Sequence, residues 1–264
     1  MSETINEHGL KRYIDESIKR AIRKRCGFGC VICGNAIVQY HHFAPPFKDA
    51  KEHNPEGIAL LCGSCHNEVS TGFASNIKVS HASKNPFCLR KGFTSHKLKM
   101  DNDYPVIVVG TARWEKTVTI FEVLGEPILQ IEPPEQPNTP YLITGLFCVQ
   151  EGNELFRIVK NEWIGLIKNW DITFSGGRVT IRRKLHDIAL ELQYTPPSNI
   201  NITKIDMYYK GARIFGDKNG FKVTAPNKST ISIGSSNFKG ISCHTAFLID
   251  HTSVIAGYMC EYTG

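Results

Sequence analysis

The pattern of apolar and polar positions changes character near residue 100. Between residues 9 and 25 apolar side chains recur every three or four positions, which predicts an amphipathic helix with lysines and arginines on its other faces. A second helix is expected over residues 74–83, and Asn85-Pro86 should end it. Residues 97–103 are polar enough to form a linker. Beyond Tyr104 the apolar residues instead form short runs between turns, which is typical of β-strands.

The second part of the chain is expected to be an antiparallel, sandwich-like β domain, because many short strands follow one another at close spacing. Ser175-Gly176-Gly177 predicts a hairpin turn between two of them. From Ile214 onward, glycine-rich turns and short Ile/Val runs are expected to extend the sheet or stack on it. The predicted strands cover residues 106–109, 117–123, 141–149, 155–159, 171–174, 178–181, 188–194 and 205–209.

Length and composition agree with two domains of an α+β protein. The chain has 264 residues, of which 41% are hydrophobic, so it can bury more than one core. No apolar run approaches the roughly 18 residues that a membrane helix needs. We therefore expect residues 1–99 and 100–264 to form separate domains, with no membrane partner.

Positive charge is concentrated in the first domain. Residues 1–100 hold 15 Lys+Arg and 8 Asp+Glu, a net +7, whereas residues 101–264 hold 16 and 17, a net −1. After Glu16 the predicted helix carries only basic charges, which favours contact with nucleic-acid phosphates over a merely solvated face, without specifying sequence. The candidate nucleic-acid-binding residues are Lys19, Arg20, Arg23, Lys24 and Arg25.

Two Cys-x-x-Cys pairs, Cys30/Cys33 and Cys62/Cys65, predict a structural zinc site. Each pair can point two thiolates at one ion about 2.3 Å away, and two pairs close a tetrahedral shell that leaves no position for water. Disulfides are the alternative. However, nine cysteines is an odd number and no signal peptide is recognised, so we expect a reducing, cytoplasmic setting.

The surroundings of these cysteines resemble the HNH endonuclease family. His41-His42-Phe43 follows Val38-Gln39-Tyr40, and Ile58-Ala59-Leu60-Leu61 leads into Cys62-Gly63-Ser64-Cys65-His66, as in the ββα-metal unit of that family. The resemblance covers roughly residues 10 to 95. It implies that His41 and His66 bind a catalytic divalent ion and that His42 is the general base, giving products with a 5′ phosphate and a 3′ hydroxyl.

The residue chemistry is compatible with these roles. Adjacent side chains on a regular strand point to opposite faces, so one histidine of the doublet can bind an ion while the other addresses a water molecule. A neutral imidazole can take a proton from that water. The alternative is that the histidines are extra zinc ligands or outer hydrogen-bond donors in a non-catalytic zinc finger.

The chain departs from the family pattern at two positions. Gly57 stands where the family usually has the Asn that braces the loop between the strands. Asn54 is the candidate to replace it, and a turn held by Pro55 and Gly57 is the alternative. Ser70 stands where a three-histidine site would have a third ligand. Two imidazoles leave room for water and phosphate oxygens, which favours magnesium or manganese as the catalytic ion.

Three functions follow as hypotheses. The leading one is a metal-dependent endonuclease acting on DNA, most simply double-stranded; by analogy with bacterial defence systems, its role would be antiphage defence or restriction. The second is a zinc-stabilised nucleic-acid-binding module without catalysis. The third is a sensor, whose β domain binds a regulatory ligand or protein and controls the nuclease. One metal pocket cuts one strand, so double-strand cleavage would need two nicks or a homodimer, for which the β domain is the expected surface.

Overall fold

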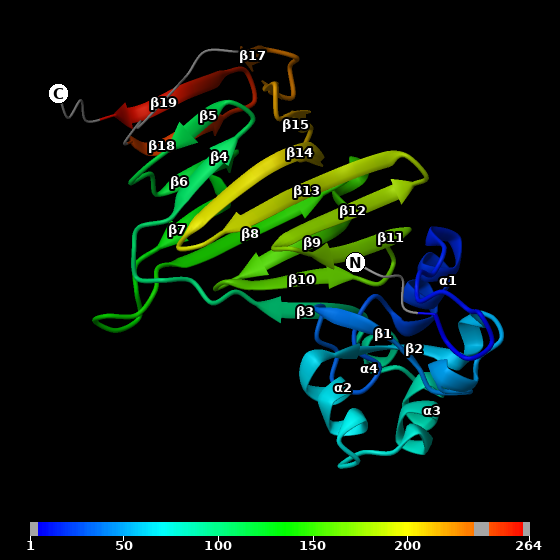
Figure 1. The fold of residues 1–264 in the computed structure, drawn as a ribbon. Helices are drawn as coiled ribbons and strands as arrows, with labels where there is room; N and C mark the ends of the chain where they lie inside the picture. Colours follow the sequence, from blue (N-terminus) through cyan, green and yellow to red (C-terminus); the bar gives the residue numbers. More distant parts are fainter. Residues whose placement is uncertain (1–4, 235–242, 261–264) are drawn as a thin grey trace. The chain divides into compact units, whose positions relative to one another are not determined.

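The computed structural model of the chain describes residues 5–234 and 243–260 (Figure 1). It divides into two compact units. Unit 1 comprises Met1–His96 together with Gly165–Phe174, and unit 2 comprises Lys97–Ile164 together with Ser175–Gly264. The chain passes from unit 1 to unit 2 after His96 and returns to unit 1 for one short segment.

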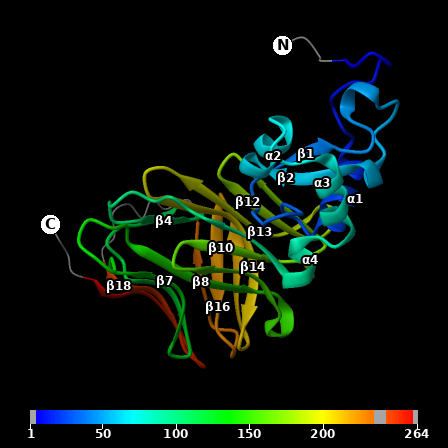
Figure 2. The ribbon, with the colours of Figure 1, turned by 90° about the horizontal axis from the view of Figure 1, so that it is seen from below.

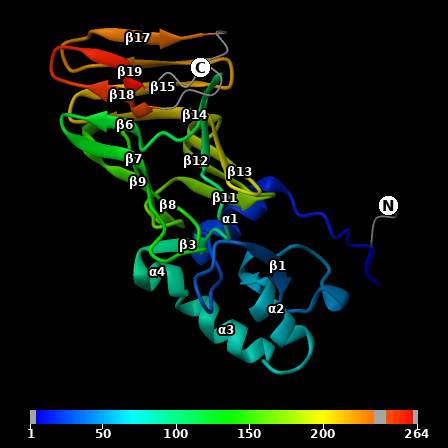
Figure 3. The ribbon, with the colours of Figure 1, turned by 90° about the vertical axis from the view of Figure 1, so that its left-hand side faces the viewer.

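Unit 1 contains most of the helices and one small antiparallel sheet. Strands β1 and β2 pair along their full lengths, from Val38 opposite Cys62 to His42 opposite Ile58. Helix α2 begins immediately after β2, so the two strands and the helix follow one another in the chain (Figure 1 and Figure 3). The elements are α1 (Glu16–Cys26), β1 (Val38–His42), η1 (Phe47–Asp49), η2 (Pro55–Gly57), β2 (Ile58–Cys62), α2 (Gly63–Ser70), α3 (Asn76–Lys84), α4 (Phe87–Lys91), β3 (Phe93–Lys97) and β11 (Asp171–Ser175).

Helix α1 is shorter than the pattern predicted. Asp15 has an extended backbone and precedes the helix, so residues 9–14 lie outside it. The helix ends at Gly27, whose φ of 71° places it in the left-handed region that suits glycine. Ile22 and Cys26 are fully buried and pack with β2, all five residues of which are buried. These contacts form the core beneath the β1–β2 sheet.

A buried ion pair joins α1 to the segment that returns to unit 1. The Arg23 guanidinium donates from Nε and Nη2 to the two carboxylate oxygens of Asp171, at 2.9 and 2.7 Å, and from Nη1 to the Tyr40 hydroxyl at 2.9 Å. Burial alone would lower the pKa of Arg23, but the hydrogen bond with Asp171 and the Tyr40 contact raise it. Arg23 thus fixes Asp171 against β1.

Unit 2 is built from largely antiparallel sheets (Figure 2). One sheet runs β19-β18-β6-β7-β8-β9-β10, and the other runs β12-β13-β14-β15-β16-β17 with β4 and β5 attached to β14. The pairs β18·β6 and β14·β4 are parallel. The strands are β4 (Val106–Val109), β5 (Ala112–Trp114), β6 (Thr119–Val123), β7 (Glu126–Glu132), β8 (Leu142–Cys148), β9 (Glu154–Val159), β10 (Glu162–Leu166), β12 (Arg178–Lys184), β13 (Asp187–Thr195), β14 (Asn199–Tyr209), β15 (Ala212–Asp217), β16 (Gly220–Thr224), β17 (Thr230–Ile233), β18 (Cys243–Ile249) and β19 (Val254–Cys260); the short helix η3 (Gln150–Gly152) precedes β9.

An aromatic core joins the two sheets of unit 2. Phe247 of β18 contacts Trp114 of β5 and Phe221 of β16, with ring centroids 5.2 and 5.1 Å apart, and stacks on Phe121 of β6 at 5.5 Å. Burial alternates along β4 and along most of β8, as expected for strands with one buried face. The expectation of a largely antiparallel β region is therefore confirmed, whereas its parallel pairs were not anticipated. Among the described residues, no helix is long and apolar enough to cross a membrane.

Candidate functional site

The four cysteines of the two Cys-x-x-Cys pairs meet in unit 1. Their sulfur atoms all lie within 4.8 Å of one another, and Cys33 Sγ is 3.5 Å from Cys62 Sγ. Neighbouring sulfurs in a tetrahedral zinc shell with bonds of about 2.3 Å are about 3.8 Å apart. Cys30, Cys62 and Cys65 are buried, whereas Cys33 is exposed. The four residues can therefore hold a metal ion such as zinc in a closed structural site.

The acid–base chemistry of the thiols fits a bound cation. Burial raises the pKa of Cys33 to about 12, helped by the neighbouring Cys30 and opposed by a backbone hydrogen bond from Asn35. Burial also raises the pKa of Cys65, with Cys30 and Cys62 acting in the same direction. Burial also tends to raise the pKa of Cys62. Hydrogen bonds from the Cys65 backbone and the Cys33 thiol outweigh this effect, so the pKa of Cys62 is lowered. Four thiolates this close repel one another, and a divalent cation would remove that repulsion.

Local hydrogen bonds shape the turns of both Cys-x-x-Cys pairs. The Gly34 N–H donates to the Cys30 carbonyl at 2.9 Å, which closes the first turn, and Gly34 has a φ of 83°. The Val31 N–H donates to the Leu60 carbonyl at 3.0 Å and ties this turn to β2. In the second pair Cys62 is the N-cap of α2, and its sulfur accepts from the Cys65 N–H at 3.5 Å.

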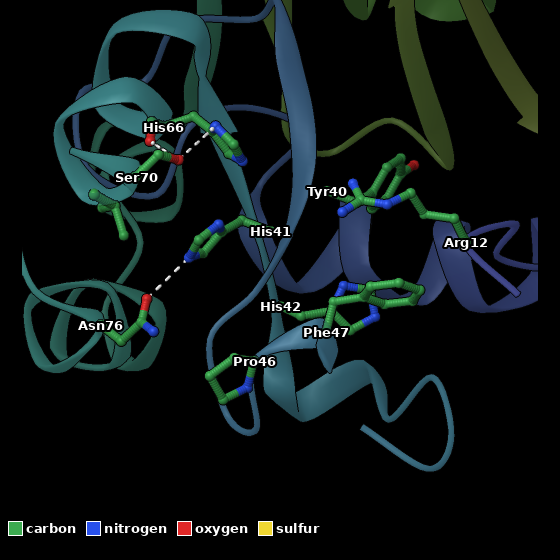
Figure 4. A pocket seen from close by; sticks show the side chains of 10 residues that line it. Arg12, Tyr40, His41, His42, Pro46, Phe47, His66, Ser70 and Asn76 are labelled. Atoms are coloured by element: carbon green, nitrogen blue, oxygen red, sulfur yellow. Dashed lines mark hydrogen bonds between the residues drawn. The ribbon is translucent and has the colours of Figure 1, made fainter. Parts of the chain in front are cut away.

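The three predicted histidines line one open pocket of about 290 Å³ in unit 1 (Figure 4). His41 and His42 end β1, and His66 lies in the first turns of α2. The rings of His41 and His66 meet edge to face with centroids 5.0 Å apart. The other residues around the pocket are Arg12, Tyr40, Pro46, Phe47, Val69, Ser70 and Asn76.

His41 faces the helices, and its ring has a partner on α3. Its Nε2 lies 2.9 Å from Oδ1 of Asn76, the first residue of that helix. His66, across from it, has Nδ1 3.4 Å from the Ser70 hydroxyl, which also donates to the His66 carbonyl at 2.9 Å. Burial, with the positive charges of His41 and Arg12, lowers the pKa of His66. A neutral imidazole with a free lone pair is what a metal ion requires.

His42 turns away from His41, toward the loop that follows β1. Its Nε2 is 3.0 Å from His53 Nδ1, and its ring lies 5.3 Å from the Phe47 ring. Burial, followed by the charges of His53, Arg12 and His41, lowers the pKa of His42 from 6.5 to about 4. His42 is therefore neutral near pH 7 and can accept a proton.

The loop between the strands is held by the backbone of Gly57. Its carbonyl accepts from the N–H groups of Phe43 and Ala44, at 2.9 and 3.2 Å. A Cβ at this position would lie 2.0 Å from the Ala44 carbonyl oxygen, so the approach requires glycine. Asn54, the predicted bracing residue, lies in the same loop, where its Oδ1 caps the turn η2 by accepting from the Glu56 N–H at 3.0 Å. Asn54 does not line the histidine pocket.

Most of the predicted nucleic-acid-binding side chains have partners inside unit 1. Arg23 is buried against Asp171, which removes it from the surface, and Arg20 lies 3.5 Å over the Trp170 ring. Arg25 donates to the carbonyls of Pro55 and Ile58. Lys19 pairs with Glu16 at 2.8 Å, and Lys24 is exposed.

Three residues of the site were missing from the sequence-based set. Arg12 lines the pocket, with its guanidinium 4.8 Å over the Phe47 ring. His53 and Asn76 contact the histidine doublet from elsewhere in the chain. Arg12 lies in the basic stretch and His53 beside Asn54, but the spacing of neither residue indicates a role in the site. For Asn76 the sequence indicates only that a helix begins nearby.

Comparisons of the chain with models of known protein families, with curated proteins and with solved structures gave no match. The chemistry of the pocket is therefore inferred from its own residues.

Proposed function

We propose that unit 1 is a metal-dependent HNH endonuclease that hydrolyses phosphodiester bonds in DNA. The observation that carries this proposal is the meeting of His41, His42 and His66 in one open pocket, with the His41 and His66 rings 5.0 Å apart. The order β1, β2, α2 and the cysteine cluster at the start of α2 support it, because the resemblance implies this arrangement.

His41 and His66 would hold the divalent ion. Both rings reach the pocket, and the open shape leaves room for water and phosphate oxygens in the rest of the shell, which suits magnesium or manganese. When bound, such an ion stabilises charge on the scissile phosphate and on the leaving oxygen. In the cysteine cluster, zinc would have only a structural role.

His42 is the proposed general base. It takes a proton from a water molecule as the water oxygen forms a bond to phosphorus, and the bond from phosphorus to the 3′ oxygen breaks. That oxygen leaves with a proton from solvent, which gives a 3′ hydroxyl and a 5′ phosphate. The lowered pKa of His42 keeps the base neutral before the reaction.

Arg12 is the proposed phosphate-binding residue of the pocket. Its guanidinium lines both the histidine pocket and a neighbouring groove of about 350 Å³ that contains Lys19 and Tyr13. The groove and the pocket share His42, so a nucleic-acid backbone lying in the groove would pass the base. Arginine suits this position because its fork of N–H donors matches phosphate oxygens.

A plasmid-nicking assay tests the proposal. Supercoiled DNA is incubated with magnesium or manganese and with wild type, His42→Ala or His81→Ala. We expect His42→Ala to lose about 10²–10⁴-fold in rate, because a positioned general base contributes that much. His81 is exposed on α3, outside the pocket, so its variant should match wild type. Equal nicking by wild type and His42→Ala would refute catalysis by this pocket.

The same samples address the non-catalytic alternative. The closed cysteine cluster by itself is equally compatible with a zinc-stabilised binding module. That function predicts salt-sensitive DNA binding that survives both His42→Ala and His66→Ala, with no nicking by wild type. Faster nicking by a variant that lacks unit 2 but keeps Gly165–Phe174, which belongs to unit 1, would instead favour a sensor that restrains the nuclease.

A further inference from the structure

Each histidine of the doublet has one ring nitrogen engaged by a side chain from another part of unit 1. For His41 this partner is Asn76, whose Oδ1 lies 2.9 Å from Nε2. An amide oxygen only accepts hydrogen bonds, so the proton of the neutral His41 ring must be on Nε2. The lone pair is then on Nδ1.

For His42 a chain of two hydrogen bonds gives the same result. His53 Nε2 lies 2.9 Å from the Lys11 carbonyl oxygen, which can only accept, so a neutral His53 carries its proton there. His53 Nδ1 is left as an acceptor, 3.0 Å from His42 Nε2. His42 must donate to it, and its own lone pair is also on Nδ1. Among the described residues, no hydrogen bond to His42 Nδ1 is formed.

We propose that Asn76 and His53 are positioning residues, which hold His41 and His42 in the Nε2–H tautomer and leave both Nδ1 lone pairs for the reaction. The inference rests on the function proposed above: His42 Nδ1 would take the proton from water, and His41 Nδ1 would face the ion. An imidazole with the other tautomer would present a proton where the reaction needs a lone pair.

His66 shows the opposite arrangement. The Ser70 hydroxyl donates its proton to the His66 carbonyl, so toward His66 Nδ1, at 3.4 Å, its oxygen is an acceptor. His66 is then the Nδ1–H tautomer, with its lone pair on Nε2. Figure 4 shows the His41 ring directed toward Asn76 and the His66 ring beside Ser70, and the two rings meet edge to face. Ser70 stands where a three-histidine site would have its third ligand, and here it orients the proposed ligand His66.

Histidine tautomers can be measured directly in the full-length protein. With histidine-selective nitrogen isotope labelling, long-range proton–nitrogen correlation spectra distinguish Nε2–H from Nδ1–H rings. They would be recorded at mildly alkaline pH, with zinc retained and no other divalent ion added. We expect Nε2–H for His41 and His42 and Nδ1–H for His66. A proton on Nδ1 of either His41 or His42 would overturn the proposal.

Paired variants test the positioning residues themselves. His53→Ala should let His42 exchange between tautomers and should lower the kcat of nicking by about 10–100-fold, with KM unchanged, as for other partners that orient a reactive side chain. His53→Asn places an amide oxygen where Nδ1 was and should restore both the tautomer and most of kcat. Asn76→Ala and Asn76→Asp form the same pair for His41, because the carboxylate keeps the acceptor oxygen.

The possible failures are distinguishable. If His53→Ala leaves the His42 tautomer and kcat unchanged, His53 does not position the base, although the nuclease assignment can stand. The spectra need no turnover. If wild type shows the expected tautomers but does not nick DNA, the proposed function fails while the hydrogen-bond assignment holds.

Discussion

The cysteine cluster and the histidine pocket occupy opposite ends of the same pair of strands. Cys62 pairs with Val38 at one end, and His42 pairs with Ile58 at the other. The cluster is closed: four sulfurs lie within 4.8 Å of one another, and three of the cysteines are buried. The pocket is open, and each of its histidines uses one nitrogen on a partner within the protein. The cysteine end can therefore stabilise the fold, whereas the histidine end keeps side chains that can react.

Helix α2 connects the two sites. Cys65 belongs to the cluster and His66, the next residue, belongs to the pocket. Residues one apart on a helix point in different directions, so a single helical turn serves both sites. Fixing the cluster therefore fixes the direction of the His66 ring. The two sites should therefore respond differently to substitution. Changes at the cluster should unfold unit 1, whereas changes at the pocket should remove only the proposed DNA cleavage.

The largest expected effect is that of Cys62→Ser. Structural zinc contributes roughly 10–16 kcal/mol to the folding of small zinc domains, which is comparable with the whole stability of a domain, about 5–15 kcal/mol. We expect Cys62→Ser to lose bound zinc and the cooperative unfolding of unit 1. Metal analysis and hydrogen exchange of residues 16–91 would measure both losses.

His66→Ala is the matched control for this prediction, because His66 lies in the same helix near the cluster but outside it. It should keep its zinc and its fold while losing manganese affinity. A Cys62→Ser protein that binds zinc and unfolds like wild type would break the division between the two sites.

Gly57→Ala should act at the pocket end with a smaller effect. The added Cβ would lie 2.0 Å from the Ala44 carbonyl oxygen, so the loop after β1 must move. Overpacking of this kind costs about 1–3 kcal/mol. We expect lower thermal stability and slower nicking, because His42 and Phe47 flank this loop, with the zinc content unchanged.

Gly63→Ala provides the comparison, since nothing lies within 4 Å of a Cβ added there. It should unfold and nick like wild type. If Gly57→Ala behaves like Gly63→Ala in both assays, the backbone of Gly57 does not support the pocket.

The features predicted from the sequence are those encoded by neighbouring residues. The Cys-x-x-Cys turns are local, so their spacing sufficed to predict a four-cysteine cluster, and the four cysteines do lie together. The strands from Val106 onward were predicted from short apolar runs between turns, and each of the eight predicted runs overlaps a strand of the structure. Their extents differ by a few residues, most for β14, which begins at Asn199 instead of residue 205.

The missed features depend on contacts between distant residues. Asp171 pairs with Arg23 across 148 positions, and nothing in the local pattern marks residues 165–174 as part of unit 1. For the same reason Arg23 was expected on the surface: its charge is visible in the sequence, but its buried partner is not. Asn76 reaches His41 across 35 positions, without any periodicity to indicate it.

The smallest expected effect concerns the pH dependence of nicking. An unperturbed histidine base would lose half its activity near pH 6.5. In this pocket burial and neighbouring positive charge, including that of Arg12, lower the pKa of His42 to about 4, so the base stays unprotonated as the pH falls through 6.5. We expect kcat/KM to remain flat through that interval and to decline only toward pH 4. Zinc content and circular dichroism at each pH would exclude unfolding as the cause of any decline.

Arg12 makes this prediction specific to the pocket. Its positive charge disfavours a protonated His42, so Arg12→Ala should move the acidic limb of kcat/KM upward, toward 6.5. Arg12→Lys keeps the charge and should leave the limb in place. Both variants lose the forked donor and should raise KM, because a lysine binds phosphate only as a point charge. The position of the limb thus reports charge next to the base, and KM reports phosphate binding. If the acidic limb of the wild-type kcat/KM profile already lies at pH 6.5, His42 is not held in the desolvated pocket during the reaction. The pocket would then not lower the pKa of its base, and it would differ from the cysteine cluster only in being open.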